Sequence, residues 1–507
     1  MNRQSAPFVS TMETWFIIVV SLCIAALIRS IIFHRKHHNK LPPGPSLLHS
    51  TFLQLISKPV LINLKTGYGP IFTLYTGLVP SIFITSRSLA HQVLVIKGAV
   101  SSDRPKFFLN FNIGTCSYGP TWRLLRRNLA TEIMHPTRIK SYSWARKWAF
   151  HILISRLFEE KDDAAGVKVF DHFHNVMFRL LVLMCFGEEL DESRVDEFVK
   201  IQREMLSVVV SGKLSRFPGR LGRLLFRNLW KQFEKLRDDR EQLLLPIIKS
   251  RLDSDCLDEH GIMAYVDTLG KLRRLSEDEV DNRKGGKLTD KEMVNLCSEF
   301  VTGGTDSTSS ALQWIMANLV KHPHIQSKLY DEIVEVVGPV EVEPESVINE
   351  EDIQKMRYLK AVVLEGLRRH PPIHFLLPHR VMKEMEVEGY TIPEGATVNF
   401  MVAEMGLDPK VWNEPLEFKP ERFLVNDDVF DITGSKEIKM MPFGAGRRIC
   451  PGSDLGFLHL EYFVANLIWY FHWTLPDGYN VDFSEKAEAA VIMENPLRAR
   501  ISSRAGE

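Results

Sequence analysis

The sequence predicts a mainly α fold with a small β portion (α+β), in one large domain behind a single N-terminal transmembrane helix. Three observations support this prediction. Apolar residues recur with helical periodicity over most of the chain, and only two stretches show the short β-rich runs typical of strands. An almost wholly apolar segment lies near the N-terminus. No Gly/Ser-rich or Pro-rich linker and no internal repeat divides the rest, which predicts one domain over residues 41–507.

The N-terminal segment is predicted to be a membrane anchor. Residues 14–33 are nearly all apolar and have the length of about 20 residues that spans a bilayer, with Arg29 close enough to the end to reach the headgroups. The basic run at residues 34–40 follows, which places the remaining chain on the cytosolic side by the positive-inside rule. A cleaved signal peptide is the alternative, but no small-x-small cleavage site follows the long apolar segment. Residues 1–40 therefore form the anchor and its basic flank, and the proline-rich residues 41–45 form a stiff extended segment.

The rest of the chain is predicted to be built mainly from helices. Two β-rich stretches are expected, one at residues 71–85 with a hairpin around Gly77 and one at residues 387–400. Residues 271–287 are highly charged and predict an exposed connection. Helical periodicity predicts helices over residues 121–134, 195–210, 231–252, 290–321, 356–370 and 454–469.

The longest predicted helix, residues 290–321, has an unusual middle. Thr289 with Glu292 three residues later is a capping-box pattern, and Pro323 marks the end of the helix. Between them, residues 303–308 read Gly-Gly-Thr-Asp-Ser-Thr. Each glycine costs about 1 kcal/mol in a helix interior, and the hydroxyl side chains compete for backbone hydrogen bonds. We therefore expect a kink and a ligand pressed against bare backbone here, with a purely structural kink as the alternative.

Charge and cysteine content exclude several classes of function. Lys plus Arg equal Asp plus Glu, so nothing in the charge indicates a nucleic-acid partner. The six cysteines are scattered without a CxxC pair, which argues against a disulfide framework and against zinc or iron–sulfur sites, and fits a reducing compartment. Cys450 is therefore distinguished by its neighbours alone.

Those neighbours form a glycine-broken loop, residues 443–452 (FGAGRRICPG), directly before a predicted helix. Glycines allow left-handed or tightly turned backbone and close approach to a flat ligand. A cysteine ahead of a helix is a candidate metal ligand, because exposed N–H groups and the helix dipole favour its thiolate. Together these features indicate a haem site with Cys450 as ligand and Arg448 near a propionate; a buried, inert cysteine is the alternative.

The loop resembles the pattern Phe-x-x-Gly-x-Arg-x-Cys-x-Gly of the cytochrome P450 family and matches every fixed position. Residues 365–368 and 420–423 look like the family's Glu-x-x-Arg and Pro-Glu-Arg-Phe elements, and residues 122–126 look like its Trp-x-x-x-Arg element. The resemblance covers essentially the whole chain, with the elements in the expected order. Residues 397–404 and 447–467 look most like plant A-type microsomal members, closest to family 89, subfamily A.

The resemblance implies a haem b (iron protoporphyrin IX) whose iron has Cys450 as its axial ligand. Trp122 and Arg126 are implied to bond one propionate, and His379 or Arg380 the other. The implied cofactor contacts are Trp122, Arg126, His379, Arg380, Phe443, Arg448 and Cys450. Glu365, Arg368 and Arg422 are implied to form a buried structural network that supports the cysteine loop.

The patch at residues 303–308 is similar to the family's Ala/Gly-Gly-x-Asp/Glu-Thr-Thr/Ser pattern, which carries the dioxygen-activating acid and alcohol. The resemblance gives Asp306 the acid position and Ser307 the alcohol position. Ser307 stands where threonine is usual, and Gly303 where most plant members have alanine. Because serine rotates more freely, we expect less well-positioned proton delivery and some escape of reduced oxygen as peroxide.

The function implied by the resemblance is a haem-thiolate monooxygenase that inserts one atom of dioxygen into a lipophilic organic substrate. Electrons are implied to come from NADPH through NADPH–cytochrome P450 reductase, with cytochrome b5 as a second candidate donor, at the endoplasmic reticulum membrane. Arg123, Arg127 and Arg447 are candidates for the docking face, and a solvated basic face is the alternative. A peroxide isomerase or dehydratase and a non-catalytic haem protein are other classes, but neither needs the Asp306/Ser307 pair.

The substrate pocket is assigned by analogy only. It would draw on residues 107–111, 208–210, 300–301, 373–377 and 490–492. These residues are mostly apolar, which is the norm for small-molecule pockets, so they indicate a lipophilic substrate and nothing more specific.

Overall fold

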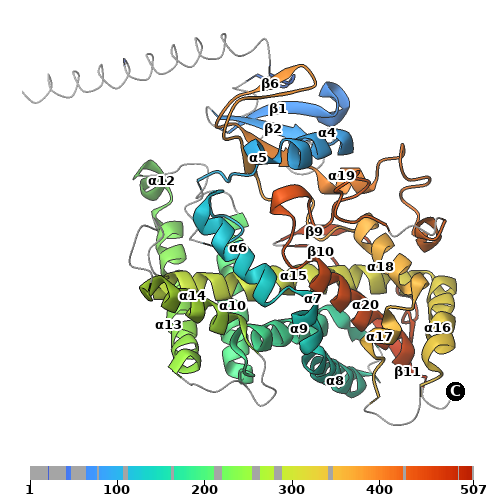
Figure 1. Cartoon of the computed structure of the whole chain (residues 1–507). Helices are drawn as coiled ribbons and strands as arrows, with labels where there is room; N and C mark the ends of the chain where they lie inside the picture. Colours follow the sequence, from blue (N-terminus) through green and yellow to red (C-terminus); the bar gives the residue numbers. More distant parts are fainter. Residues whose placement is uncertain are drawn as a thin grey trace, which may run out of the picture.

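Helices make up most of the structure and pack into one body, with a small β-rich region at one end (Figure 1). The structure is a computed structural model that describes Ser21 and residues 41–46, 64–76, 79–106, 112–161, 165–210, 220–253, 263–278, 288–340, 346–425, 430–488 and 490–504. The predicted class, mainly α with a small β portion, is confirmed. The predicted transmembrane helix at residues 14–33 lies outside the described residues, apart from Ser21.

The helices fall into two runs along the chain. The first run comprises α4 (Arg87–His91), the π-helix η1 (Gln92–Ile96), α5 (Gly98–Ser101), α6 (Pro120–Glu132), α7 (Pro136–Ser141), α8 (Ser143–Glu160), α9 (Val169–Phe186), α10 (Glu192–Val210), α12 (Arg220–Leu225) and α13 (Arg227–Asp253). The second comprises α14 (Tyr265–Asp278), α15 (Asp290–Lys321), α16 (Pro323–Val337), α17 (Glu350–Ile353), α18 (Arg357–Arg369), α19 (Val402–Gly406) and α20 (Ser453–Tyr470), with the 3₁₀ turns η2 (Pro420–Phe423) and η3 (Gly446–Arg448).

The main sheet has the strand order β1-β2-β7-β4. Strand β1 (Ile71–Thr76) pairs antiparallel with β2 (Val79–Ile84), β2 pairs parallel with β7 (Thr397–Phe400), and β7 pairs antiparallel with β4 (His379–Arg380). The smaller sheets are β3-β11-β8, β9-β10 and β5-β6. Their strands are β3 (Val167–Lys168), β5 (Met385–Val387), β6 (Tyr390–Ile392), β8 (Phe471–Thr474), β9 (Glu485–Ala487), β10 (Val491–Met493) and β11 (Arg498–Ser503). Both predicted β regions are therefore confirmed.

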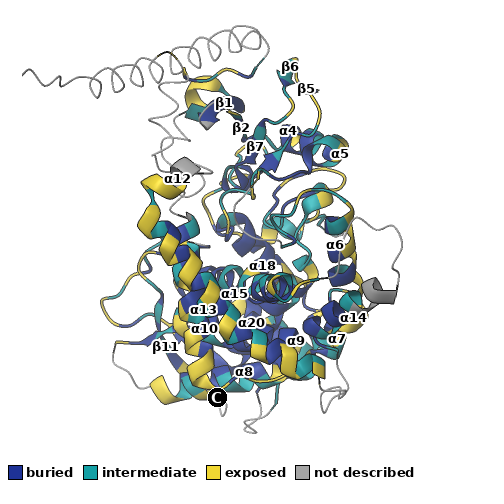
Figure 2. Cartoon of the chain, turned by 90° about the vertical axis from the view of Figure 1, so that its left-hand side faces the viewer, coloured by how far each residue is buried: buried dark blue, intermediate teal, exposed yellow. Residues whose placement is uncertain are grey.

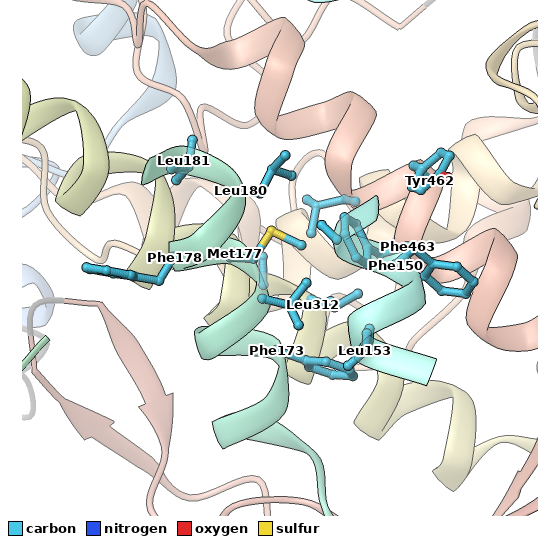
Figure 3. Packing of buried hydrophobic residues seen from close by; sticks show 14 of the residues in the cluster. Phe150, Leu153, Phe173, Met177, Phe178, Leu180, Leu181, Leu312, Tyr462 and Phe463 are labelled. Carbon is cyan, nitrogen blue, oxygen red and sulfur yellow. The ribbon is translucent and has the colours of Figure 1, made fainter. Parts of the chain in front are cut away.

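The core lies where α8, α9, α15 and α20 meet. Figure 3 shows Phe150 of α8, Phe173 of α9, Leu312 of α15 and Phe463 of α20 side by side, and all four are fully buried. Helix α9 is the one described helix long and apolar enough to cross a membrane, but most of it is buried inside the protein. Its apolar character is therefore that of a core helix.

Helix α15 crosses the middle of the body and is mostly buried, whereas α10 and α13 expose one face to solvent (Figure 2). The bounds of α15 are those that the capping box and Pro323 predict. The Thr289 hydroxyl accepts from the Glu292 N–H, and the Glu292 carboxylate accepts from the Thr289 N–H. Pro323 also begins α16, since proline tolerates the first helical position.

One prediction about the connections is wrong in part. Residues 271–287 were expected to form an exposed connection, but residues 271–278 continue α14. Val266 and Leu269 of this helix are buried and Leu272 packs partly against the core, so an apolar face at helical spacing outweighs the charges. The remainder, residues 279–287, lies outside the described residues.

Candidate functional site

The loop before α20 is held in a tight turn that closes on itself. The Cys450 N–H donates to the Phe443 carbonyl over 2.9 Å. Gly444 and Gly446 have φ of 72° and 70°, and a Cβ on Gly446 would lie 2.1 Å from the Leu94 carbonyl oxygen. These two positions need glycine for the reason the sequence suggested. Gly452 does not, because its φ is −97° and a Cβ there would meet only ordinary contacts.

The Cys450 thiol is partly buried, and burial raises its pKa. The Gly452 N–H and the Arg126 charge act in the opposite direction and favour the thiolate. The helix start therefore supports the thiolate, as expected, but burial outweighs it in the protein alone. A metal ion bound to the sulfur supplies the compensating positive charge, because a ligating thiol is deprotonated.

Cys450 faces one large, mostly apolar cavity, and α15 forms the other wall. Gly303, Ser307 and Ala311 line this cavity, four residues apart, and therefore lie on one face of the helix. Phe443, Gly444 and Cys450 of the loop line it as well. The structure thus brings together the glycine-rich helix patch and the cysteine loop, which are far apart in the sequence.

Asp306 and Ser307 point in different directions from adjacent positions of α15. The Ser307 hydroxyl lines the cavity and donates to the Gly303 carbonyl at 2.9 Å. Asp306 does not line the cavity, and its carboxylate instead pairs with Nε2 of His174 on α9 at 2.9 Å. The hydroxyls of Thr305 and Ser309 also donate to carbonyls four residues earlier, so the patch remains helical with its polar groups bonded internally.

Trp122 and Arg126, one turn apart on α6, both line the cavity. Trp122 Nε1 is buried and has no hydrogen-bond partner among the described residues. For Arg126, burial lowers the pKa while the nearby Cys450 raises it, and the part of the chain that the structure describes gives its guanidinium no hydrogen bond or ion pair. A buried donor and a partly buried one thus face the cavity without acceptors among the described residues, and a polar acceptor on a ligand would satisfy both.

Arg448 lines the same cavity but is bonded to the protein. Its guanidinium donates to the carbonyls of Ser102, Ile113 and Cys116, and it stacks over the Trp122 ring at 4.4 Å. Burial lowers its pKa to about 10. These contacts hold the loop at residues 113–116 against the cysteine loop.

The structure separates the two candidates for a second propionate contact. His379 is buried and lines the cavity, and its Nδ1 donates to the Ser101 carbonyl at 2.7 Å. Burial lowers the His379 pKa to about 3, so the ring is neutral and its Nε2 is an acceptor. Arg380 does not line the cavity and is paired with Asp103 at 3.2 Å. Arg380 is therefore committed elsewhere, because adjacent residues of β4 point to opposite sides.

Glu365, Arg368 and Arg422 do meet in a closed, buried network. Arg368 grips both carboxylate oxygens of Glu365 at 2.7 and 2.8 Å, and Arg422 reaches the same carboxylate at 3.1 Å. The remaining N–H groups of the two guanidiniums donate to main-chain carbonyls, among them those of Gly406 and Asn413. The network fastens α18 to the segment at residues 406–422.

The analogy-based pocket assignment holds only in part. Phe300, Ile373, Leu376 and Leu377 line the cavity, whereas residues 107–111 lie outside the described residues. Among the described residues, the other assigned positions do not line it. Val301 is on the opposite side of α15, residues 208–209 pack against α13, and the Val491 carbonyl is bonded to Ser310 and Trp314.

Sequence reasoning missed many of the residues that line the cavity, among them two charged side chains, Glu299 and Arg104. Arg104 is buried and Glu299 partly buried, and burial shifts the pKa of Glu299 up to about 7 and that of Arg104 down to about 9. Glu299 had a detectable signal, because it precedes Gly303 and Ser307 by four and eight residues on the same helix face. Arg104 had none, since it follows a short helix in irregular chain.

These residues fit a haem. The unpartnered Trp122 Nε1 and Arg126 are suited to a propionate, the glycine turn leaves the backbone bare beside the cavity, and Cys450 offers a soft ligand. Phe443 lies at the cavity wall beside the loop. The fit rests on donors that the protein leaves open.

Comparisons with known proteins agree with the assignment of a haem site. The family model described as Cytochrome P450 matches residues 41–501. Cytochrome P450 89A9 of Arabidopsis thaliana is 44% identical, covering 96% of this chain and 98% of that protein. Flavonoid 3'-monooxygenase of Arabidopsis thaliana is 31% identical, covering 92% of each chain, and Cytochrome P450 98A1 of Sorghum bicolor is 30% identical over 96% of each. The resemblance to family 89, subfamily A, is thereby confirmed.

Solved structures give the same fold. A zebrafish cytochrome P450 structure with progesterone superimposes with a TM-score of 0.73 at 22% identity, covering 88% of this chain and 100% of that one. A second zebrafish structure, with abiraterone, gives a TM-score of 0.72 at 21% identity, with 88% and 99% covered. At this identity the likeness concerns the fold alone.

Proposed function

The chain belongs to the cytochrome P450 family, whose haem b and monooxygenase activity it shares, and we propose that it oxidises a lipophilic substrate with electrons from NADPH–cytochrome P450 reductase. The observation that carries the proposal is the single cavity lined by both Cys450 and the Ser307 face of α15. A thiolate ligand and a hydroxyl on opposite walls are what splitting dioxygen beside a substrate requires. We propose Cys450 as the axial ligand of the haem iron.

The haem, when bound, supplies the iron at which dioxygen is reduced and its O–O bond broken. Trp122 and Arg126 hold a propionate, and Arg448 and Phe443 support the loop around it. Ser307 has its hydroxyl at the cavity wall, where it donates to the Gly303 carbonyl and reaches the cavity by rotation of the side chain. Asp306, paired with His174 and with 26% of its side chain exposed, takes protons from water and replaces the proton that Ser307 donates into the cavity.

The remaining parts of the proposal concern place and partners. Residues 1–40 anchor the protein in the endoplasmic reticulum membrane, and residues 41–507 form the catalytic domain on the cytosolic side. Arg123, Arg127 and Arg447 are exposed and form the basic face that receives the reductase, with cytochrome b5 as a second donor. Deleting residues 1–40 should move the protein from the microsomal pellet to the supernatant.

The reduced carbon monoxide spectrum tests the haem-thiolate site directly. The full chain should show the Soret band of a thiolate-ligated haem, and Cys450→Ser should lose it while keeping the fold. NADPH and reductase should then give oxygenated products from pooled plant metabolites. Consumption of a hydroperoxide without any oxygenated product would instead indicate an isomerase or dehydratase.

A further inference from the structure

Glu299 is the one acidic side chain among the described residues that line the cavity. It projects from α15 towards the loop at residues 113–114, with Leu377 and the guanidinium groups of Arg104 and Arg448 nearby. Glu299 is partly buried, and burial raises its pKa to about 7. A carboxyl in such a place requires hydrogen bonds in compensation.

The protein supplies part of that compensation. The two Glu299 carboxylate oxygens accept from the N–H groups of Ile113 and Gly114, each at 2.7 Å. An ionised carboxylate has about four acceptor sites, so about two stay open. The arginines nearby leave them open, since Arg104 donates to the carbonyls of Gly114, Leu377 and Pro378, and Arg448 donates to carbonyls as well.

The position of Glu299 on the helix gives these open sites a direction. Glu299 lies eight residues before Ser307 on the cavity face of α15, which corresponds to about 12 Å along the helix axis. A molecule bonded to Glu299 therefore extends towards Ser307 over apolar wall. The distance sets the separation between its polar end and the end that is oxidised.

We propose that Glu299 determines substrate specificity by accepting a hydrogen bond from a hydroxyl or N–H group on an otherwise lipophilic substrate. The inference rests on the proposed function, because it names the class of molecule that the same cavity takes. The substrate carries its donor at the end remote from Ser307. Substrates without such a donor leave the buried carboxylate sites unpaired and bind more weakly.

A structural role for Glu299 is the rival explanation. Its carboxylate holds the N–H groups of residues 113–114, while Arg104 and Arg448 hold carbonyls of the same loop, so it also serves as a clamp. A clamp alone would affect every ligand equally. A substrate contact affects only ligands that present a donor, and a matched pair of probes separates the two roles.

The test uses para-hydroxystilbene and para-methoxystilbene; in the second a methyl group replaces the hydroxyl hydrogen, so that the donor is lost. Their dissociation constants are measured on the haem-loaded full chain from the Soret shift and, independently, by equilibrium dialysis, at about pH 8, where a carboxyl with a pKa of about 7 is ionised. We expect the wild type to prefer the hydroxy probe by about tenfold, the preference typical of a hydrogen bond to a charged group. Glu299→Gln should reduce this preference several-fold.

Glu332→Gln is the matched control. Glu332 accepts from two successive backbone N–H groups, of Tyr358 and Leu359, at 2.7 and 2.8 Å, but it does not line the cavity. It should leave the preference unchanged. Equal weakening of both probes by Glu299→Gln, or no preference in the wild type, would overturn the proposal. Binding is read without turnover, so absence of oxygenated product would count against the proposed function and not against this inference.

Discussion

Two groups of polar side chains in this protein differ in how completely the protein itself satisfies their hydrogen bonds. Around Glu365, the N–H groups of Arg368 and Arg422 donate to the carboxylate or to main-chain carbonyls. Around the cavity, Trp122 Nε1 and Arg126 have none among the described residues. The first group is complete in the folded chain, and the second is complete only with a ligand.

Whether the protein itself supplies the hydrogen-bond partners distinguishes side chains that stabilise the fold from side chains that bind a ligand. A satisfied network contributes to the fold, because losing one partner leaves an uncompensated charge. An unsatisfied donor at a cavity costs stability until a ligand arrives, so its removal should weaken binding and spare the fold. The following predictions test this contrast.

The largest effect is expected from Arg368→Ala. It would leave the fully buried Glu365 carboxylate without its bidentate partner, at a cost of about 3 to 5 kcal/mol in the free energy of unfolding. Chemical denaturation of the full chain measures this. Arg369→Ala is the control, since Arg369 donates one hydrogen bond, to the Leu416 carbonyl, and its loss should cost about 1 kcal/mol. Equal losses for both variants would show that the network has no special weight.

The next effect concerns pH and the carboxyl of the cavity wall. Burial raises the Glu299 pKa to about 7 from an unfolded value of 4.5, so between these values the folded chain retains a proton that the unfolded chain loses. Raising the pH through this window should therefore cost the wild type about 3 kcal/mol of stability relative to Glu299→Gln. The difference in unfolding free energy between the two proteins should be flat above about pH 7.

A second carboxyl with a raised pKa, Glu461, does not affect this difference between the two proteins. Burial raises its pKa to about 7 as well, but it lies on α20 and does not line the cavity. Its contribution is common to the wild type and Glu299→Gln and cancels in the difference. A difference that did not vary between about pH 4.5 and pH 7 would mean that Glu299 is as well solvated as in the unfolded chain.

Arg126→Ala should show the opposite pattern to Arg368→Ala. Removing a partly buried guanidinium without a partner among the described residues should leave the unfolding free energy of the haem-free protein unchanged or slightly higher. The haem dissociation constant should rise about tenfold or more, because a charge-assisted bond to the propionate is lost. Haem transfer to apomyoglobin measures it, and the exposed neighbour Arg127 supplies the control in Arg127→Ala. Normal haem retention by Arg126→Ala would remove it from the cofactor site.

Sequence patterns predicted the fold class and the local motifs, because these depend on residues close together in the chain. The capping box of Thr289 and Glu292, the helix bounds of α15 and the Glu365–Arg368 spacing are all local. The sequence could not show which way a side chain or carbonyl points, because this depends on contacts between distant parts of the chain. Arg380 pairs with Asp103, and the Val491 carbonyl bonds to α15 instead of lining the cavity.

The smallest effect, and the sharpest test of the cavity wall, is expected from Ser307→Thr. The Ser307 hydroxyl donates to the Gly303 carbonyl at 2.9 Å, but a serine side chain rotates away from this bond more easily than a β-branched threonine. Threonine should hold the proton donor in place and raise the fraction of NADPH that yields product instead of peroxide. We expect a change of about twofold, since an energy of about 0.4 kcal/mol suffices. Parallel measurement of NADPH, product and peroxide decides the matter, with Thr305→Ser as the control because Thr305 is buried and does not line the cavity. An unchanged ratio would mean that the Gly303 bond already fixes the serine rotamer.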